Sequence, residues 1–430
     1  MNIAFDIDGV LTDFEWFLNV YGTRYFSKKF HMDAKVVNPE TSKIAERFGY
    51  GQKEETAFYT RYLLWYARKM PIRENAATTI NMLREEGHKV YFITARALAN
   101  HDNLVGQLMR RILKNWLREN RVEYDGIHFV SVSNSAEEKR KLCEQLQIDV
   151  MVEDEPGNIR EISKVCRVIC MLADYNKSLH DVNHALDFGE VYRYIHESQY
   201  ADFKVLSYQE RALLSREKTV SYFQKLSQYY KKLPFDKDYL RQRENHLRKM
   251  VPIPRFFVNS IFGIRIVQGS IPQGTSGAIF VCNHRRSLDV YMCYCILNKT
   301  MARILTKREY EERMIGRLMK YAGIIFIKRE DKKSGKMVRN LMIQTVMHGG
   351  NIVLFPEGTR NRTDEVLLPF KYGAVYMAQV TGAPIIPITI DRISKREHVV
   401  RIGEEMRVDY KDDLTMCKQR LQEQMRNMLI

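Results

Sequence analysis

Short apolar runs and helix-like stretches alternate along the first 175 residues of the chain. The apolar runs have the length and composition of buried strands and lie near residues 2–10, 89–93, 127–131, 150–152 and 168–171. Apolar positions with helical period lie between them, at 76–86, at about 102–120 and at 137–146. This alternation predicts an α/β domain over residues 1–175, with a Rossmann-like parallel sheet covered by helices on both faces. Residues from about 14 to 70 have helical spacing and few strand signals, which predicts a small helical cap.

A second alternating pattern follows Pro252 and Pro254, two residues that interrupt regular structure. Strand-like runs lie near 278–282, 324–328, 352–355 and 385–390, and an apolar helix is predicted to begin at Gly373. A chain of 430 residues exceeds one ordinary core, because domains average about 150 residues. We therefore expect two α/β domains, at 1–175 and 236–430, joined by a basic helical linker over 176–235.

Positive charge is concentrated between the two predicted domains. The net charge is +16, and residues 204–255 contain 13 Lys and Arg against 5 Asp and Glu. The same stretch is rich in aromatic residues and leucine, a combination that binds lipid headgroups at a membrane interface. A solvated linker helix or a site for single-stranded RNA could have this composition too. We expect residues 204–262 to contact an anionic membrane surface, with interfacial side chains at Phe256, Phe257, Ile261 and Phe262.

No apolar run approaches the roughly 20 residues that a membrane-spanning helix needs. The first residues do not resemble a signal peptide, and the seven cysteines show no repeated C-x-x-C spacing. These features predict reduced thiols in a cytoplasmic protein that is peripheral on the inner face of the membrane.

Asp6 and Asp8 follow the first predicted strand, at the edge where ligands bind in open parallel sheets. Carboxylates two positions apart leave a strand on the same side. They can share a divalent cation, and Mg²⁺ would keep both ionised despite their mutual repulsion. One carboxylate could then attack a phosphorus atom while the other transfers the proton of the leaving oxygen. An exposed acidic turn is the simpler interpretation of these two residues alone.

Polar residues at the following strand ends favour a phosphate site over an acidic turn. Thr94 comes directly after the second strand and offers a hydroxyl group. Lys139 lies in the helix before the fourth strand, where it can neutralise phosphate charge, although Lys141 could take this place. Glu153 and Asp154 follow the fourth strand and provide a further carboxylate pair for the metal.

These clusters resemble the motifs of the haloacid dehalogenase superfamily of phosphatases, and their flanks are similar to its 5′(3′)-deoxyribonucleotidase branch. The resemblance covers about residues 1–175, and segments 70–73 and 92–96 also fit that branch. It implies a Mg²⁺-dependent phosphatase with Asp6 as nucleophile and Asp8 as acid and base. It also implies that Thr94 and Lys139 bind phosphate, and that the metal ligands are Asp6, Asp8, Asp154 and Glu153. Glu153 stands where the family more often has aspartate.

His284 and Asp289 lie where the strand near 278–282 gives way to a helix. Their side chains can meet across one helical turn. Asp289 would then fix the imidazole tautomer while His284 accepts the proton of a substrate hydroxyl. That hydroxyl can attack a thioester directly, so no serine or cysteine nucleophile is required. The spacing is common by itself and gains meaning only from its neighbours.

Two later strand ends supply groups for a phosphate monoester. Arg329 follows the strand near 324–328. The strand near 352–355 leads into a turn that offers a carboxylate, exposed N–H groups and a guanidinium, formed by Pro356, Glu357, Gly358, Thr359 and Arg360. An ordinary turn would explain this segment alone but not the ordered set.

Together these blocks resemble the glycerol-3-phosphate and 1-acylglycerol-3-phosphate acyltransferase family over roughly residues 236–430. The approach segment 263–269 is also similar to that family's. The resemblance implies an α/β glycerolipid acyltransferase fold with His284 and Asp289 as the catalytic pair, and Pro387 on the acyl-donor side. It places near the acceptor phosphate the residues Arg329, Glu357, Gly358, Thr359 and Arg360. Arg285 and Arg286 stand where the family more often has uncharged residues, which favours a more anionic acceptor.

The leading hypothesis is transfer of an acyl group from acyl-CoA or acyl carrier protein to the hydroxyl of a lysophospholipid. The acceptor would be 1-acylglycerol 3-phosphate and the product phosphatidic acid, while the first domain hydrolyses a small phosphomonoester. Alternatively, the first domain is a non-catalytic regulatory module, or the acyltransferase uses another hydroxyl acceptor. Nucleic acid is the partner that the two sets of motifs disfavour, despite the basic charge.

Overall fold

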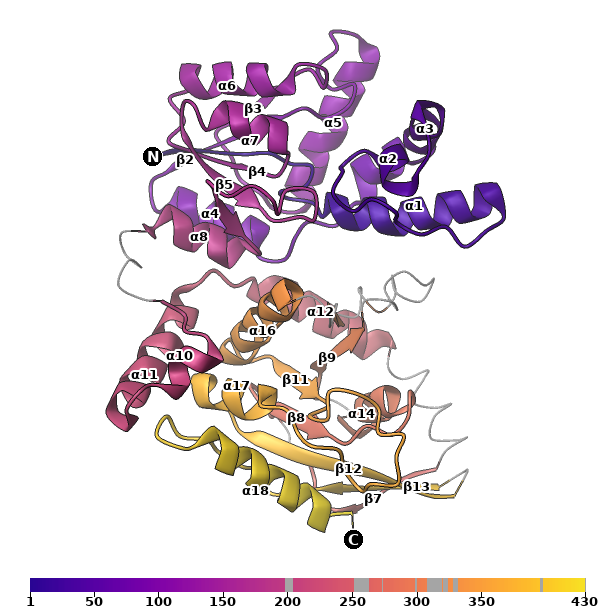
Figure 1. The fold of residues 1–430 in the computed structure, drawn as a ribbon, viewed down its shortest axis with the longest axis vertical. Helices are drawn as coiled ribbons and strands as arrows, with labels where there is room; N and C mark the ends of the chain where they lie inside the picture. The colour runs from indigo at the N-terminus through magenta and orange to yellow at the C-terminus, as the bar shows by residue number, and fades with distance from the viewer. Residues whose placement is uncertain are drawn as a thin grey trace. The chain divides into compact units, whose positions relative to one another are not determined.

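The computed structural model describes residues 1–197, 204–250, 263–272, 274–297, 300–307, 319, 324–327, 332–394 and 397–429. They form two compact units, each with its own sheet (Figure 1). Unit 1 comprises Met1–Ala201 and Pro234–Asp236, and unit 2 comprises Asp202–Leu233 and Lys237–Ile430. The assignment of functional domains to residues 1–175 and 236–430 stays a prediction.

The sheet of unit 1 has six strands in the order β3-β2-β1-β4-β5-β6, and every neighbouring pair is parallel. Its strands are β1 (Asn2–Phe5), β2 (Lys89–Thr94), β3 (Gly126–Phe129), β4 (Val150–Glu153), β5 (Arg167–Met171) and β6 (Asn183–Ala185). All four residues of β4 are buried, as expected for a central strand covered on both faces. The predicted Rossmann-like parallel sheet is confirmed.

Five helices of unit 1 connect these strands or follow them: α4 (Ala76–Glu85), α5 (Leu104–Glu119), α6 (Ser135–Gln145), α7 (Pro156–Ile162) and α8 (Phe188–Ile195). Their beginnings have the expected polar caps. Asn103 accepts a hydrogen bond from the Gly106 N–H at the start of α5, and Asp187 accepts one from the Glu190 N–H at the start of α8. Each cap satisfies one backbone donor that the first helical turn leaves free.

Three further helices form the cap: α1 (Phe14–Phe30), α2 (Ile44–Phe48) and α3 (Gln52–Lys69). They enclose an aromatic cluster of their own, in which the Phe17 and Tyr66 rings lie 4.6 Å apart. Arg47 is fully buried and donates hydrogen bonds to Glu15, Asn19 and two backbone carbonyls. The helical character predicted for residues 14 to 70 is thus present, with an internal core that holds the three helices together.

The sheet of unit 2 has seven strands in the order β10-β9-β11-β8-β12-β13-β7. They are β7 (Ile264–Gln268), β8 (Ile279–Cys282), β9 (Ala302–Lys307), β10 (Ile325–Ile327), β11 (Asn351–Leu354), β12 (Ile385–Ser394) and β13 (Glu397–Ile402). The pair β12–β13 is antiparallel and the other neighbouring pairs are parallel. This mixed sheet confirms the predicted second α/β unit and adds β7, β9 and β13 to the predicted strands.

The helices of unit 2 are α10 (Tyr208–Ala212), α11 (Arg216–Lys232), α12 (Lys237–Met250), α14 (Asp289–Leu297), α16 (Lys332–Met347), α17 (Gly373–Thr381) and α18 (Leu414–Asn427). Helix α14 packs on the face of β8 that carries Phe280 and Cys282. Because side chains alternate along a strand, Ile279 and Val281 lie on the opposite face, and α17 contacts β8 there. The sheet is therefore covered by helices on both sides.

Helix α11 corrects the prediction that the aromatic residues of 204–255 lie at a lipid interface. Its aromatic face packs against α16 and α17, and its buried side chains include Tyr222, Phe223, Leu226, Tyr229 and Tyr230. The helical period separates this core face from an exposed face that carries Lys225. The predicted interfacial residues Phe256, Phe257, Ile261 and Phe262 lie outside the described residues. No described helix combines the length and the apolarity that a bilayer span requires.

Tyr230 provides a test of this packing. Its hydroxyl lies 2.7 Å from Oδ1 of buried Asn340 on α16. We expect Tyr230→Phe to lower the free energy of unfolding by roughly 1–3 kcal/mol, because Asn340 loses a buried donor. Tyr291→Phe is the control, since Tyr291 is 39% exposed, and we expect a change below about 0.5 kcal/mol. Urea denaturation measures both, and equal losses of stability would contradict the burial of α11.

Candidate active sites

Three neighbouring strands of unit 1 bring the first set of predicted residues together. Strands β2, β1 and β4 lie side by side and parallel, so their carboxyl ends share one edge of the sheet. Asp6 directly follows β1, Thr94 is the last residue of β2, and Glu153 is the last residue of β4. The Asp6 N–H donates to the Val152 carbonyl at 2.9 Å, which fixes the start of the Asp6 loop against β4.

Lys139 reaches this edge from α6. Its side chain is fully buried, and Nζ lies 3.1 Å from Asp6 Oδ2 and 2.6 Å from Glu153 Oε2. Burial opposes the charge, but the two carboxylates outweigh it and raise the pKa of Lys139 above the ordinary lysine value. Lys141, the alternative left open by the sequence, pairs with Glu137 at 2.6 Å on the exposed face of α6. Lys139, and not Lys141, therefore lies at this edge of the sheet.

Glu153 is completely buried and accepts several hydrogen bonds. Oε1 accepts from the backbone N–H groups of Asp154 and Glu155, at 2.9 and 3.1 Å. Oε2 accepts from Lys139 Nζ and, at 3.3 Å, from Asn158 Nδ2. With both oxygens engaged by protein donors, Glu153 positions Lys139 and the Asp154 loop. Its predicted place among the metal ligands stays a prediction.

Asp154 lies close to Asp6 and Glu153, and single oxygens of the three carboxylates lie within 4.8 Å of one another. Tyr175 donates a hydrogen bond to Asp154 Oδ2. Burial, reinforced by Glu153 and Asp6, raises the pKa of Asp154 well above the usual carboxyl range. Gly9 permits this arrangement, because a Cβ there would lie 1.8 Å from Asp154 Oδ2.

Asp8 lies outside this group of three carboxylates. Its Oδ1 lies 3.7 Å from the Arg96 guanidinium, which in turn lies over the Tyr66 ring of the cap. The structure thus separates the two aspartates that the sequence places two positions apart. One faces the carboxylate cluster, and the other faces an arginine and the cap.

The donor set at this edge fits a divalent cation. Asp6 Oδ1 and Asp8 Oδ1 are buried and have no hydrogen-bond partner among the described residues. Burial raises the pKa of Asp6 to about 7, with Lys139 opposing and Glu153 and Asp8 adding to the shift. Crowded, buried carboxylate oxygens are the ligands that Mg²⁺ prefers. Thr94 Oγ1 is also buried and unpartnered in the described part of the chain, as a hydroxyl kept for a substrate would be.

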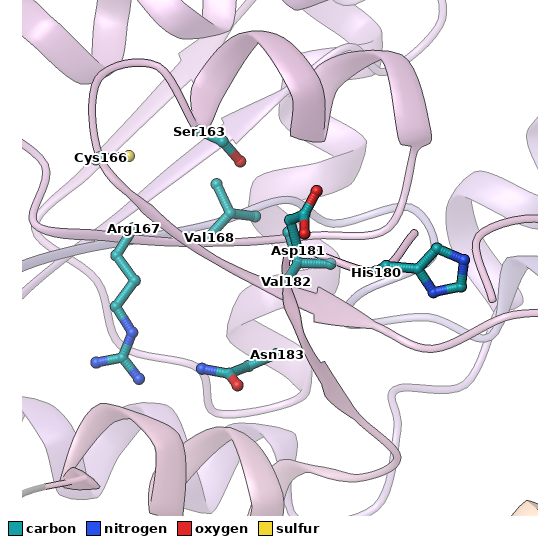
Figure 2. Close-up of a pocket in the computed structure, with 8 residues that line it drawn as sticks. All are labelled: Ser163, Cys166, Arg167, Val168, His180, Asp181, Val182 and Asn183. Carbon is teal, nitrogen blue, oxygen red and sulfur yellow. The ribbon is translucent and has the colours of Figure 1, made fainter. Parts of the chain in front are cut away.

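A cavity of about 330 Å³ lies elsewhere in unit 1 (Figure 2). It opens beside the amino ends of β5 and β6, and its lining includes Arg167, His180 and Asn183. None of the residues predicted from the sequence for either site lines it. The candidate phosphate site at the carboxyl ends is therefore distinct from this cavity.

The second set of predicted residues meets at the carboxyl ends of β8 and β11 in unit 2. These strands are parallel neighbours. His284 follows β8, and its Nδ1 lies 3.0 Å from Oδ2 of Asp289, the first residue of α14. The same Asp289 oxygen accepts the N–H groups of Arg285 and Arg286 at 2.7 and 2.6 Å. The imidazole also stacks on Phe355, with ring centroids 4.3 Å apart.

These contacts determine how the imidazole is presented. Asp289 is 4% exposed and its carboxylate can only accept from Nδ1, so Nδ1 carries the proton. Nε2 is then the nitrogen left with a lone pair in the neutral ring. The predicted meeting of His284 with Asp289 is present, with the tautomer that a general base needs.

Glu357 holds the backbone of the loop that contains His284. It is 3% exposed, and Oε1 accepts the His284 N–H at 2.8 Å while Oε2 accepts the Leu368 N–H at 2.9 Å. Burial raises the pKa of Glu357, and these two hydrogen bonds oppose the shift. Gly358 follows with a φ of 71°, which allows the chain to turn directly after Glu357.

Cationic groups lie beside His284. Arg360 donates to Ser287 Oγ at 2.6 Å, and Arg285 donates to the Glu365 carbonyl at 2.6 Å. Burial, together with repulsion from neighbouring arginines, lowers the pKa of Arg286 below the ordinary arginine value. Cations packed together in this way favour binding of an anion.

The remaining three predicted residues of the second site differ in where they lie. Thr359 is exposed, and Pro387 lies in β12 opposite Val281 of β8. Arg329 lies outside the described residues.

Two protein-family models match the chain, one in each half. Residues 1–200 match the family model described as 5′ nucleotidase, deoxy (pyrimidine), cytosolic type C protein. Residues 264–391 match the model described as acyltransferase. The chain joins a nucleotidase-like region to an acyltransferase-like region.

Curated relatives with a printed acyltransferase activity match about a third of the chain. A chloroplastic 1-acyl-sn-glycerol-3-phosphate acyltransferase of Brassica napus is 30% identical over 167 residues, which are 37% of this chain and 45% of the relative. The 1-acyl-sn-glycerol-3-phosphate acyltransferase of Haemophilus influenzae is 34% identical over 133 residues, which are 30% of this chain and 54% of the relative. The chain thus spans about half the length of the curated relatives it matches.

Two solved structures are also similar to part of the chain. The 1-acyl-sn-glycerophosphate acyltransferase PlsC of Thermotoga maritima is 18% identical, with a TM-score of 0.35, and the match covers 56% of this chain and 92% of that one. The D,D-heptose 1,7-bisphosphate phosphatase of B. bronchiseptica is 12% identical, with a TM-score of 0.28, and the match covers 46% and 99%.

Gly9 allows a matched test of the carboxylate cluster. We expect Gly9→Ala to abolish Mg²⁺ binding, because its Cβ would displace the Asp154 carboxylate. Gly87 is the control, since it has a similar positive φ (87° against 94°) and nothing within 4 Å of a built Cβ. Both alanines cost roughly 1–2 kcal/mol of stability through backbone strain. The contact with Asp154 adds to this cost at position 9 only, so Mg²⁺ binding is compared between folded samples of the two variants. Isothermal titration with Mg²⁺ measures the difference, and unchanged binding by Gly9→Ala would exclude Asp154 from the cation site.

Proposed function

We propose that the chain is a two-site enzyme of glycerophospholipid metabolism. Unit 2 transfers an acyl group from acyl-CoA or acyl carrier protein to the free hydroxyl of 1-acylglycerol 3-phosphate and forms phosphatidic acid. Unit 1 hydrolyses a small phosphomonoester with Mg²⁺. The observation that carries the proposal is the His284–Asp289 pair, which is oriented by part-buried hydrogen bonds at a strand end within an acyltransferase-like region.

The acyl transfer needs a base but no enzyme nucleophile. Nε2 of His284 takes the proton of the acceptor hydroxyl as the oxygen attacks the thioester carbonyl carbon. Asp289 stabilises the imidazolium that forms, because its carboxylate holds Nδ1–H at 3.0 Å. The carbon–sulfur bond then breaks, and the thiolate recovers the proton from the imidazolium.

Binding of the acceptor phosphate is assigned to the arginines near His284. Arg285, Arg286 and Arg360 lie near the base, and Arg329 is predicted to join them. A guanidinium binds two phosphate oxygens at once, which would fix the position of the acceptor hydroxyl relative to Nε2. Glu357 contributes by holding the His284 backbone, through its hydrogen bond at 2.8 Å.

In unit 1, Asp6 is proposed to attack the phosphorus atom and form a phospho-aspartate. Asp8 protonates the leaving oxygen and later takes a proton from the water that hydrolyses the intermediate. Lys139 and Thr94 bind phosphate oxygens. Bound Mg²⁺, held by Asp6 and Asp154 with Asp8 and Glu153 as further predicted ligands, would neutralise charge on the phosphate.

The acceptor lipid places unit 2 at a membrane surface. We propose a cytoplasmic protein that binds peripherally to anionic lipid on the inner face. Its net charge of +16 supports this proposal, as does the basic stretch 204–255. Because the aromatic residues of α11 are core, the attraction is expected to be mainly electrostatic.

Acyl transfer in anionic vesicles tests the first activity, with acyl-CoA and acyl carrier protein thioesters as donors. We expect His284→Ala to lower the rate of phosphatidic acid formation by roughly 10²–10⁴-fold. Asp289→Asn is expected to lower it by roughly 10²-fold or more, since the amide still accepts the two N–H groups but stabilises the imidazolium poorly. Full activity of His284→Ala would remove His284 from its role as base, and full activity of Asp289→Asn would remove Asp289 from its supporting role. No product from the wild type with either donor would mean that the acceptor is wrong.

Phosphate release tests the second activity. The substrates are an aryl phosphate and a panel of deoxynucleoside 5′-monophosphates, chosen because residues 1–200 match a nucleotidase model. We expect Mg²⁺-dependent hydrolysis by the wild type and a loss of roughly 10²-fold or more with Asp6→Asn. A wild-type protein that binds Mg²⁺ but hydrolyses no substrate would instead make unit 1 a regulatory module.

A further inference from the structure

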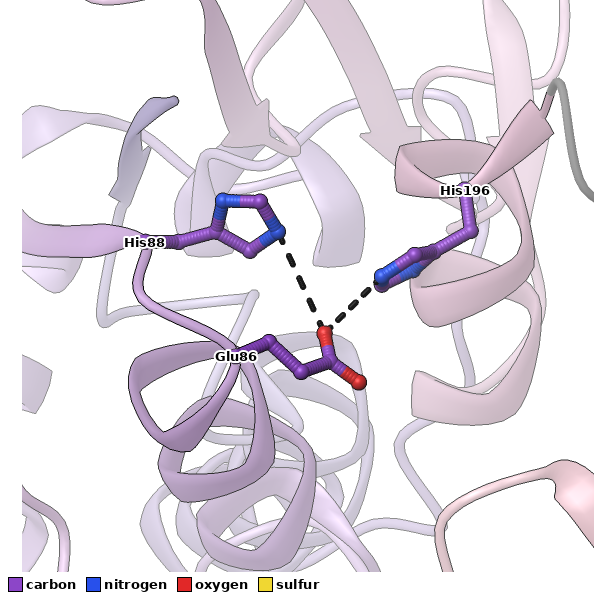
Figure 3. A group of neighbouring side chains, drawn as sticks. All are labelled: Glu86, His88 and His196. Atoms are coloured by element: carbon purple, nitrogen blue, oxygen red, sulfur yellow. Dashed lines mark ion pairs between the residues drawn. The ribbon is translucent and has the colours of Figure 1, made fainter.

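A second group of metal-ligating side chains lies in unit 1, away from the carboxylate cluster. Glu86 directly follows α4, His88 directly precedes β2, and His196 directly follows α8 (Figure 3). Position 88 is at the amino end of β2, whereas Thr94 and the carboxylate cluster lie at the carboxyl ends of the strands. The two groups are thus at opposite edges of the same sheet.

Three donor atoms converge here. Glu86 Oε2 lies 2.8 Å from His196 Nε2 and 3.9 Å from His88 Nε2, and all three atoms lie within 4.8 Å of one another. Zinc bonds to histidine nitrogen and carboxylate oxygen are about 2.0–2.2 Å, which puts tetrahedral ligand atoms roughly 3.3 Å apart. The two observed separations from Glu86 Oε2 lie on either side of that spacing.

Hydrogen bonds on the far side of each group orient these donors. His196 Nδ1 donates to the Tyr192 carbonyl at 3.0 Å, since a carbonyl can only accept. Tyr192 Oη donates to Glu86 Oε1 at 2.5 Å, which leaves Oε2 facing the histidines. His88 Nδ1 lies 3.2 Å from the amino nitrogen of Met1. Such outer hydrogen bonds accompany most metal-bound histidines.

The contact between His196 and Glu86 also fits a metal. In a neutral His196 with its proton on Nδ1, the Nε2 lone pair would face a carboxylate oxygen at 2.8 Å. That contact is repulsive unless a cation, either a proton or a metal ion, lies between the two atoms.

We propose that Glu86, His88 and His196 form a Zn²⁺ site with water as the fourth ligand. Two imidazoles and one carboxylate favour zinc, whereas the all-carboxylate cluster at Asp6 favours Mg²⁺. The site joins the end of α8 to the α4–β2 connection, and α8 is the last described helix of unit 1 before residue 198. The ion therefore links α8 to the segment between α4 and β2, and so to the core of unit 1. This role is independent of either proposed activity.

Zn²⁺ titration of the full chain tests the proposal, with a chromophoric chelator as competitor and excess Mg²⁺ to occupy the carboxylate cluster. We expect one Zn²⁺ per wild-type chain, and an affinity weaker by roughly ten-fold or more in His88→Ala, His196→Ala and Glu86→Gln. His101→Ala is the control, because His101 is exposed and outside the group, and it should bind Zn²⁺ as the wild type does.

His196 is 8% exposed, so its variant could lose structure, but His88 is only half-buried and its variant is the safer test. Zn²⁺ is expected to raise the melting temperature of the wild type and leave that of His88→Ala unchanged. Binding that survives His88→Ala and His196→Ala but disappears with Asp154→Asn would overturn the proposal. The absence of Zn²⁺ binding by the wild type would do the same and leave Glu86 and His196 as a simple ion pair.

Discussion

Both candidate sites depend on a glutamate that is buried at the carboxyl end of a parallel strand. Glu153 holds Lys139 Nζ at 2.6 Å in unit 1, and Glu357 holds the His284 N–H at 2.8 Å in unit 2. Burying a carboxylate is costly unless donors satisfy it, and here the donors belong to the segments that carry the chemistry. Each glutamate therefore determines where a lysine or a histidine loop can lie. Parallel pairing supplies the rest, because it gathers several strand ends at one edge of the sheet.

Hydrogen bonds and burial also determine how the functional groups at these strand ends are oriented and which of their atoms carry a proton. Asp289 accepts three donors with one oxygen, so His284 has little freedom to rotate and presents Nε2. In unit 1 the buried carboxylates outnumber the single buried lysine beside them. Burial raises the pKa of Asp6 to about 7, Lys139 opposes this shift, and Glu153 and Asp8 add to it. Excess negative charge in a buried site is relieved by a cation, which is why the cluster fits Mg²⁺.

Much of this could be predicted from the sequence, because the important residues directly follow apolar runs. Asp6, Thr94 and His284 were identifiable by that position together with the other polar residues at neighbouring strand ends. The choice of Lys139 over Lys141 depended on how α6 is rotated against the sheet, which only packing determines. The hydrogen bonds from Tyr175 to Asp154 and from the His284 N–H to Glu357 are made by loops, which no periodic sequence pattern predicts. Strand β9 was missed because buried Arg303 interrupts its apolar run, and the core face of α11 was mistaken for a lipid-binding face because aromatic residues suit both.

Every described residue of each site lies within a single unit, so we expect the two proposed activities to be independent of each other. The experiment that tests this follows both reactions in single preparations of the wild type, His284→Ala and Asp6→Asn. We expect His284→Ala to lose phosphatidic acid formation and keep Mg²⁺-dependent phosphate release, and Asp6→Asn to show the reverse. A substitution that removed both activities from a folded protein would contradict this expectation, because the two sites would then act as one.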